Sequence, residues 1–377
     1  MDEQIMQPKE IRKNEDYCTF CPKMCHFACP IADLKRSETL SPWGKQQVAR
    51  MVDAGQIPLS REAAALAYEC LTCGRSQSAC DHQLSDSESL LALRARAVRE
   101  GLAPEVALHF AEKFRLHSNP YAENLQQKIK TLIPSIAKSG TNSTLFFASC
   151  HSLALQPQSL SLYWELFQKL KIPDIGIYSE ALQCCGQSLQ VLGHEEEFKK
   201  NARLQFKQLK QVKTLVVGSP ECAWAFRELY PKYGFQLKTK ILTLPEFLAP
   251  YLSKLNLKCG DKTQEYYYHD ACYLGRHLGQ YDVPRDLLTK VLGFSPLELR
   301  CSRQESLCSG AGGGYSLIDP QSSNALAQLT LGNLREKKAV LITACPQAAE
   351  KFKQNAGSLI VKDWCSFIAE AIQLHGL

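Results

Sequence analysis

The spacing of the cysteines constrains this chain more than any other feature of its sequence. Seventeen of the 377 residues are cysteine, and an arrangement near the N-terminus recurs once at offsets of 51 or 52 residues. A second arrangement recurs in the C-terminal two thirds at offsets of 122 to 124 residues. Nearly constant offsets indicate two internal duplications, and each duplicated set of thiols indicates a metal site.

The remaining composition narrows the class of protein. The chain opens Met1-Asp2-Glu3 with no basic region before an apolar core, which predicts no secretory signal and a reducing compartment. The net charge is 44 minus 38, or +6, and the basic residues are spread along the chain, which predicts no nucleic-acid partner. Apolar runs stay shorter than the roughly 18 residues that a membrane-spanning helix needs. We therefore expect a cytoplasmic protein, either free or peripheral on the inner membrane face.

Helical patterns dominate the first third of the chain. They cover residues 41–51, 60–67, 88–100 and 104–116. Ser60 is a suitable N-cap for the second of these helices. A polar stretch that contains Pro and Gly follows, so we predict a helical domain over 1–133 and a linker over 134–143.

Short apolar runs alternate with amphipathic stretches after the linker. The apolar runs lie at 144–148, 214–218, 266–269 and 339–343, and the helical patterns lie at 160–171, 195–210 and 324–337. This alternation predicts an α/β fold with a mainly parallel sheet. The offsets divide it into copies over 144–260 and 261–377, with cysteines after the strands, where open parallel sheets usually build their sites.

The N-terminal cysteines form two runs of similar spacing. They read Cys18-x2-Cys21-x3-Cys25-x3-Cys29-Pro30 and Cys70-x2-Cys73-x2-Ser76-x3-Cys80-Asp81. Both resemble the C-x2-C-x2-C-x3-C-P run of bacterial two-cluster ferredoxins, in which the fourth cysteine of each run ligates the other cluster. The first run departs from that pattern by one extra residue before Cys25, and the second by a serine at the third ligand position.

This resemblance implies an α-helical N-terminal domain of the ferredoxin type with two iron–sulfur clusters. One 4Fe-4S cluster is then held by Cys18, Cys21, Cys25 and Cys80, and the other by Cys29, Cys70, Cys73 and Ser76. Ser76 leaves the type of the second cluster undecided. Either its alkoxide ligates iron, or the vacant corner yields a 3Fe-4S cluster or an open iron. Zinc is the alternative for all these thiols, although zinc ribbons usually separate their cysteine pairs more widely.

Two adjacent cysteines, Cys184 and Cys185, mark the first of the later copies. Neighbours in an extended strand point to opposite faces, so both thiols reach one metal only through a tight bend, which Gly186 can supply. Cys150 and Cys222 each follow a strand-like run and can converge on the pair to give four thiols. The second copy offers three thiols at the corresponding positions, Cys272, Cys308 and Cys345.

The segments around these cysteines resemble the cysteine-rich domain, or CCG domain, of heterodisulfide reductase. They are residues 144–151, Cys184-Cys185-Gly186 and 218–224 in the first copy, and 269–277, 308–314 and 344–347 in the second. With the ferredoxin-type runs in front, the architecture is similar to the D subunit of heterodisulfide reductase and to the iron–sulfur subunits of glycolate oxidase and anaerobic glycerol-3-phosphate dehydrogenase. The resemblance implies a duplicated α/β CCG domain behind the helical one.

A complete CCG site has five cysteines, and this chain departs from it three times. Ala225 stands at the last ligand position of the first copy, and Ser309 and Ala348 stand at ligand positions of the second. For the first copy, the resemblance implies a third iron–sulfur cluster held by Cys150, Cys184, Cys185 and Cys222. Zinc, or a reactive dithiol at Cys184-Cys185, is the alternative there.

Two interpretations stand for the second copy. Its three cysteines hold a cluster whose fourth position is open or is taken by Ser309 or His269, or they are a relic that keeps the fold. His269-Asp270 is equally a strand-end pair in the local hydrogen-bond network, and the glycine-rich run 310–314 is expected to be flexible backbone rather than a phosphate loop. Cys259, Cys301 and Cys365 match no motif, and we expect them to be buried free thiols.

The resemblance implies an iron–sulfur electron-transfer subunit of an oxidoreductase complex. Its donor would be a flavoprotein dehydrogenase or an electron-transfer flavoprotein, because the sequence shows no flavin or nicotinamide fold of its own. The acceptor would be a quinone, reached through a membrane quinone-reactive subunit, or a thiol/disulfide couple. Two alternatives remain: a disulfide reductase that acts through Cys184 and Cys185, and a non-catalytic iron–sulfur sensor or assembly module.

Overall fold

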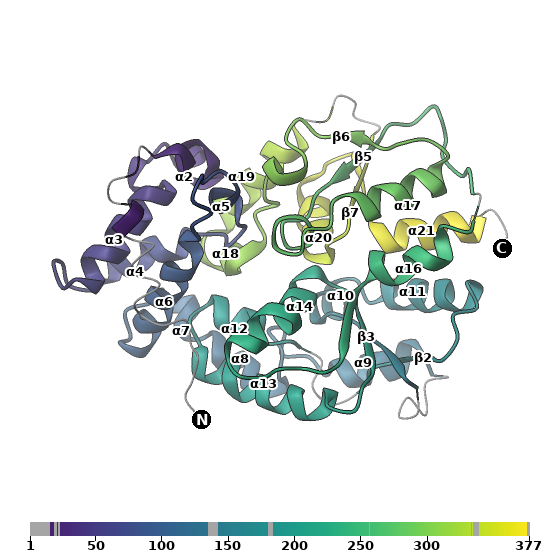
Figure 1. Ribbon diagram of the computed structural model, residues 1–377, viewed down its shortest axis with the longest axis horizontal. Coiled ribbons are helices and arrows are strands. Elements are labelled where there is room, and N and C mark those ends of the chain that lie inside the picture. Colours follow the sequence, from purple (N-terminus) through teal and green to yellow (C-terminus); the bar gives the residue numbers. More distant parts are fainter. Residues whose placement is uncertain are drawn as a thin grey trace.

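An N-terminal group of helices precedes two parallel β-sheets that are each surrounded by helices (Figure 1). The computed structural model describes residues 16–18, 21, 23–134, 142–179, 184–255, 257–332, 334 and 339–374. The linker predicted at 134–143 lies mostly outside these residues. No helix in the described part of the chain has both the length and the apolar character needed to cross a membrane.

Short helices build the N-terminal unit, as its sequence pattern predicts. They are η1 (Met24–Ala28), α2 (Pro30–Lys35), η2 (Glu38–Leu40), α3 (Pro42–Asp53), α4 (Arg61–Tyr68), α5 (Arg75–Ser78), α6 (Asp86–Arg99), α7 (Glu105–Leu108), α8 (Phe110–His117) and α9 (Leu125–Leu132). The Ser60 side chain accepts a hydrogen bond from Ala63 N, so the predicted N-cap of α4 is confirmed. The helix predicted at 104–116 is wrong as a single element, because His109 ends α7 and precedes α8.

The first sheet unit has the predicted alternation of strands and helices. Its elements are β1 (Thr144–Phe147), α10 (Cys150–Leu155), α11 (Gln158–Lys169), β2 (Ile175–Ile177), α12 (Gln187–Val191), α13 (Glu195–Leu209), β3 (Thr214–Val217), α14 (Pro220–Trp224), η4 (Ala225–Leu229), α15 (Tyr230–Lys232), β4 (Lys240–Thr243) and α16 (Leu244–Leu252). The parallel strand order is β2-β1-β3-β4, and Thr144 lies opposite Ile175 and Thr214.

The second sheet unit repeats the first. Its elements are β5 (Tyr266–His269), η5 (Tyr273–His277), α17 (Asp282–Leu292), β6 (Leu297–Glu298), η6 (Arg303–Glu305), η7 (Gly312–Gly314), α18 (Tyr315–Ile318), α19 (Pro320–Leu331), β7 (Val340–Thr343), α20 (Pro346–Asn355), β8 (Ile360–Asp363) and α21 (Trp364–Leu374). Its parallel order, β6-β5-β7-β8, matches that of the first sheet position by position. The duplication inferred from the cysteines therefore extends to the topology.

The three parts of the chain pack against one another. Helix α21 of the second sheet unit lies on α11 of the first, and the Tyr163 hydroxyl donates to Asp363 Oδ2 at 2.6 Å across this contact. The N-terminal helices contact both sheet units, with α6 against α12 and α2 against α19 (Figure 1). In the second cysteine run, Cys73 consequently lies near Cys272 and Cys308 of the second sheet unit.

Candidate metal centres

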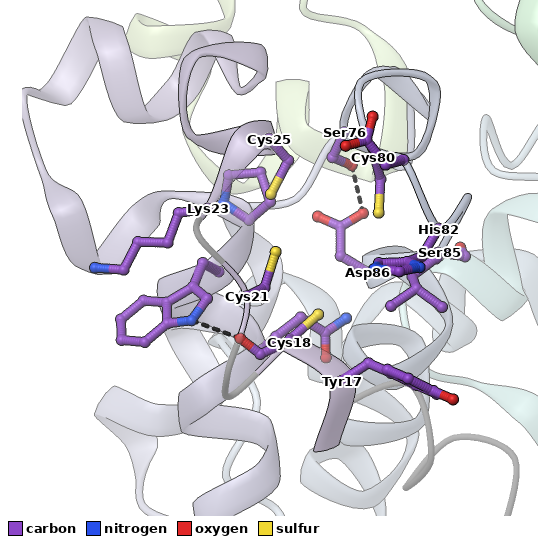
Figure 2. A pocket seen from close by; sticks show the side chains of 15 residues that line it. Tyr17, Cys18, Cys21, Lys23, Cys25, Ser76, Cys80, His82, Ser85 and Asp86 are labelled. Atoms are coloured by element: carbon purple, nitrogen blue, oxygen red, sulfur yellow. Dashed lines mark hydrogen bonds between the residues drawn. The ribbon is translucent and has the colours of Figure 1, made fainter.

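Site 1 consists of Cys18, Cys21, Cys25 and Cys80, the cysteines assigned to the first cluster. All four line one cavity of about 100 Å³ (Figure 2). Cys25 lies in η1, whereas Cys80 follows α5, so both cysteine runs contribute thiols to the same cavity. This is the exchange of the fourth cysteine that the ferredoxin pattern implies.

The thiols of site 1 are held in a partly buried environment. Burial raises the pKa of Cys18 to about 12 and that of Cys25 to about 11, and the nearby thiols and the Asp86 carboxylate add to both shifts. Without metal, both thiols therefore stay protonated at neutral pH. A metal group must displace these protons, and its positive charge is what would stabilise four thiolates here.

The cavity of site 1 fits a group larger than one ion. Within the described part of the chain, no three His, Cys, Asp or Glu side chains are arranged to hold a metal ion. The thiols of site 1 instead stand around an open space. Thiolates are the usual ligands of iron–sulfur clusters, so donor set and space together fit a 4Fe-4S cluster.

Ser76, predicted as a ligand of the second cluster, hydrogen-bonds to a carboxylate. Its Oγ donates to Oδ1 of Asp86 at 2.6 Å (Figure 2). Asp86 is the first residue of α6, is buried, and lines the cavity of site 1. Sequence reasoning missed Asp86, although an acidic residue at a helix start directly after a cysteine run was a usable signal.

Site 2 comprises Cys29, Cys70 and Cys73, the three cysteines assigned to the second cluster. They line a cavity of only about 20 Å³, which they share with Lys45. The Lys45 side chain is fully buried, and its Nζ lies 3.4 Å from Cys29 Sγ and 3.4 Å from the Glu69 carbonyl oxygen. A space of this size holds about one water molecule. The residues at site 2 therefore do not fit an iron–sulfur cluster.

Site 3 consists of Cys150, Cys184, Cys185 and Cys222, and its four thiols are all buried. Cys150 begins α10 directly after β1, and Cys222 lies in α14 after β3. Gly186, with a φ of 79°, caps α12 and supplies the bend expected after Cys184-Cys185. The strand ends and the bend together bring the four predicted residues to one place.

The thiols of site 3 contact one another in a chain. Cys150 Sγ donates to Cys184 Sγ at 3.5 Å, and Cys185 lies in thiol contact with both Cys184 and Cys222. The contact with Cys150 together with burial raises the pKa of Cys184 well above its usual value. By donor chemistry the four thiols suit iron–sulfur or zinc ligation, although they lie in contact and are not arranged as the ligands of a single metal ion. Ala225, at the position of the absent fifth ligand, is completely buried.

Site 4, predicted as Cys272, Cys308 and Cys345, is only partly assembled. The thiols of Cys272 and Cys308 contact each other. The pKa of Cys308 is lowered to about 7, against the effect of burial, and the contact with Cys272 is the largest cause. The backbone N–H groups of Gly310 and Gly312, in the glycine loop 310–314, and the charge of Arg276 also lower it. Cys345 Sγ instead donates to Oε1 of Glu221, at 2.9 Å, in the first sheet unit.

His269 is committed to the local hydrogen-bond network. Its Nδ1 pairs with Thr343 Oγ1 at 2.9 Å and its Nε2 with the Leu307 carbonyl oxygen at 3.0 Å, and burial lowers its pKa to about 4. Asp270 receives two hydrogen bonds of 2.6 Å from Arg285. Of the two interpretations of this pair, the structure supports the strand-end pair and leaves His269 no free nitrogen for a metal.

The glycine-rich run 310–314 is a tightly packed junction rather than flexible backbone. A Cβ at Gly310, whose φ is 87°, would lie 2.3 Å from the Ser323 carbonyl oxygen, and one at Gly313 would lie 2.8 Å from that of Cys70. The expectation of flexibility is therefore wrong, because only glycine permits these approaches. Of the three unassigned cysteines, Cys365 is buried as expected, whereas Cys259 and Cys301 are only half-buried.

Arg94 joins all three parts of the chain at this junction. Its buried guanidinium donates to the carbonyl oxygens of Cys70 at 2.5 Å, Val191 at 2.6 Å and Gly313 at 3.1 Å. Nearby, Arg276 Nε donates to the Cys73 carbonyl oxygen at 2.6 Å. Sequence analysis missed both arginines, because their role depends on contacts between residues far apart in the chain.

A cavity of about 380 Å³ opens between the two sheet units. His151 and Glu221, the neighbours of Cys150 and Cys222 at site 3, line it, as do residues of the glycine loop. The Tyr121 hydroxyl, also in the lining, hydrogen-bonds to His151 Nδ1. The cavity thus combines apolar walls with many polar side chains, and two of these, His151 and Glu221, lie one residue away from buried thiols.

Comparison with known protein families agrees with this architecture. The model of the CCG cysteine-rich domain matches residues 144–227 and 266–348. The matched ranges begin at β1 and β5, so the chain contains two copies of the CCG cysteine-rich domain, and the resemblance inferred from the cysteine motifs is confirmed.

Several curated proteins are similar to this chain. The D subunit of dihydromethanophenazine:CoB–CoM heterodisulfide reductase from Methanosarcina barkeri is 24% identical over 320 residues, which cover 81% of this chain and 78% of the relative. The probable iron–sulfur-binding oxidoreductase FadF of Bacillus subtilis is 24% identical over 74% of this chain and 42% of its own length. The EtfAB:quinone oxidoreductase of Syntrophomonas wolfei is 32% identical over 37% of this chain and 20% of its length. These relatives fit an iron–sulfur subunit of the oxidoreductase type.

Proposed function

We propose that the protein is an iron–sulfur electron-transfer subunit that connects a flavoprotein donor to a quinone or thiol/disulfide acceptor. The observation that carries this proposal is the cavity of site 1, where four thiols from two cysteine runs surround about 100 Å³. A 4Fe-4S cluster held by Cys18, Cys21, Cys25 and Cys80 would supply one-electron transfer. Site 3 offers a second set of thiols, for an iron–sulfur cluster or zinc.

The donor would meet the chain at site 1. Tyr17 lines the cavity and is 52% exposed, and Phe27, two residues after Cys25, is 78% exposed. Exposed aromatic side chains are frequent anchors of protein interfaces. A flavoprotein dehydrogenase or electron-transfer flavoprotein that covers them would come close to the four thiols, and the similarity to an EtfAB:quinone oxidoreductase supports this choice of donor.

The acceptor would enter the cavity between the CCG copies. Its 380 Å³ suit a quinone ring or a small disulfide. Reduction of either acceptor consumes protons, and the hydrogen bond between the Tyr121 hydroxyl and His151 Nδ1 places a proton within the lining. The quinone would be reached through a membrane subunit to which this chain is peripheral.

We propose three domains to match these roles: a ferredoxin-type helical domain over 1–133 and CCG domains over 144–260 and 261–377. The helices of the first domain carry site 1 and lie against both CCG copies. The boundary between the helical domain and the first CCG domain is crossed by packing contacts, since α9, at the end of the helical domain, packs on α10 and α11 of the first CCG copy.

The test is anaerobic purification with natural partners, followed by iron and acid-labile sulfide analysis and electron paramagnetic resonance (EPR). Addition of the reduced flavoprotein should convert the protein to a form with an EPR signal of a reduced 4Fe-4S cluster. In Cys21→Ala that signal should disappear, whereas Cys259→Ala, which changes a half-buried thiol outside the four sites, should keep it. Zinc in place of iron in the wild type would overturn the proposal.

A disulfide reductase that acts through Cys184 and Cys185 is the second candidate, because these two thiols contact each other and are both buried. Turnover of a small disulfide should then require this pair and vanish in Cys184→Ala. An electron-transfer subunit without this activity would accept electrons from the flavoprotein and leave disulfides unchanged. Steady reduction of a disulfide by the wild type and not by the variant would favour the reductase.

A further inference from the structure

We infer that the Lys45 ammonium group occupies the place of a second iron–sulfur cluster, so that the N-terminal unit holds one cluster rather than two. This inference rests on the proposed function, since it assumes that site 1 binds a cluster. It concerns the second cysteine run, which keeps three thiols at ligand spacing.

The size of the two cavities is the first argument. Sites 1 and 2 derive from the same pair of cysteine runs and lie in the same helical unit, so their cavity volumes can be compared directly. The cavity of site 1 measures about 100 Å³ and that of site 2 about 20 Å³. The smaller volume holds about one water molecule, whereas a 4Fe-4S cluster brings eight heavy atoms.

The position of Lys45 is the second argument. It lies on the buried face of α3 with Ala49 and Val52, at the spacing of an apolar stripe, and its side chain is only 1% exposed. Its Nζ lies 3.4 Å from the sulfur of Cys29. A buried ammonium group needs partners of opposite charge or strong acceptors, and the Glu69 carbonyl oxygen and the Asp86 carboxylate in the cavity lining provide them.

The thiols of site 2 are the third argument, because each faces a different partner. Cys29 receives the hydrogen bond from Lys45, and Cys70 Sγ receives one from Thr72 N at 3.4 Å. Cys73 lies near Cys308 and Arg276 of the second CCG copy. Ser76, at the fourth ligand position, donates to Asp86. All four residues line the same cavity of about 20 Å³, but each is engaged with a different partner.

The consequence is a change in the sign of the charge at site 2. A cluster with thiolate ligands carries negative charge, and with serine at position 76 it would lack its fourth thiolate ligand. A lysine in the core reverses the sign, so that the carboxylate of Asp86 faces a cation and the sulfur of Cys29 accepts a hydrogen bond from it. The three remaining cysteines then serve packing at the junction with the CCG copies.

The experiment counts clusters in the full chain, purified anaerobically with its natural partners. We expect Cys29→Ala and Cys73→Ala to keep the wild-type iron and sulfide content, whereas Cys21→Ala should lose about four iron atoms per chain, one cluster. Loss of about four iron atoms in both Cys29→Ala and Cys73→Ala would overturn the inference. Absence of iron from the wild type would instead defeat the proposed function, so the two failures are distinguishable.

A second variant guards against a folding defect in the cysteine mutants. Lys45→Met keeps the length of the side chain and removes its charge. We expect the integrated EPR spin of the reduced protein to be the same as in the wild type, since no cluster lies beside Lys45. If Lys45 were only a neighbour of a second cluster, this variant would change the number of spins or shift one of two reduction steps, and that result would contradict the inference.

Discussion

Cys345 of the second CCG copy donates a hydrogen bond of 2.9 Å to the carboxylate of Glu221 in the first. Glu221 is buried, and its other oxygen accepts a hydrogen bond from the Ser219 hydroxyl. The contact diverts a cysteine that the motif assigns to site 4 and uses it to join the two copies. Site 4 consequently retains only Cys272 and Cys308 as a thiol pair.

Removal of the Cys345 thiol should affect stability rather than metal content. In Cys345→Ala, a buried carboxylate loses a donor, which should lower the free energy of unfolding by about 1 to 3 kcal/mol. Denaturant unfolding monitored by circular dichroism gives this difference, with Cys301→Ala as the control at a half-buried thiol. A loss of iron in Cys345→Ala without loss of stability would show that Cys345 is a ligand instead.

Replacement of Arg94 should destabilise the junction of the three parts. Arg94→Met leaves the carbonyl oxygens of Cys70, Val191 and Gly313 without their buried donor, and each unsatisfied acceptor costs about 1 to 3 kcal/mol. The free energy of unfolding should fall by about 3 kcal/mol or more. Arg96→Met on the same helix, which breaks only an exposed pair with Glu100, should change it by at most about 0.5 kcal/mol. Equal effects of the two variants would contradict the role assigned to Arg94.

The glycine loop offers a test that separates close packing from backbone conformation. Gly310 and Gly279 both have positive φ, 87° and 70°, but only Gly310 has a neighbouring atom within 4 Å of an added Cβ. Gly279→Ala should cost about 1 to 2 kcal/mol from the left-handed conformation alone. Gly310→Ala should cost clearly more in the same thermal unfolding assay, because the loop must also move away from Ser323. Equal losses of stability in the two variants would mean that the loop moves away from Ser323 at no measurable cost in free energy.

Restoring the ligand at position 76 should not restore a cluster. In Ser76→Cys the second run regains its fourth cysteine, but Lys45 still lines the cavity of site 2, which measures only about 20 Å³. Iron content should therefore remain at the wild-type value. A gain of about four iron atoms per chain would show that the serine alone had prevented cluster binding.

Much of the fold follows from local sequence signals. Strands β1, β3, β5 and β7 were predictable because their short apolar segments alternate with amphipathic ones. Strands β2, β4, β6 and β8 were not predicted. Cysteines follow the predicted strands because parallel strands present their ends at one edge. The cap at Ser60 was predictable from its side chain. The break at His109 was not, since residues on both sides favour helix.

The candidate sites were predictable only as far as spacing determines them. Site 1 and site 3 assemble from the residues that their motifs assign. Site 2 and site 4 do not, because Lys45, Glu221 and the glycine loop act through contacts between distant segments. Lys45 was nevertheless visible as a signal in the sequence, because it lies on the apolar face of α3 with Ala49 and Val52, where a charged residue is unusual.

The proposal of a cluster at site 1 is tested most directly by EPR spectroscopy and iron analysis of Cys80→Ala. Cys80 belongs to the second cysteine run but lines the cavity formed with the first. We predict that the reduced variant loses the 4Fe-4S signal, or changes it to that of a three-iron cluster, while Cys259→Ala keeps it. A Cys80→Ala protein with the full iron content and an unchanged EPR spectrum would contradict the account.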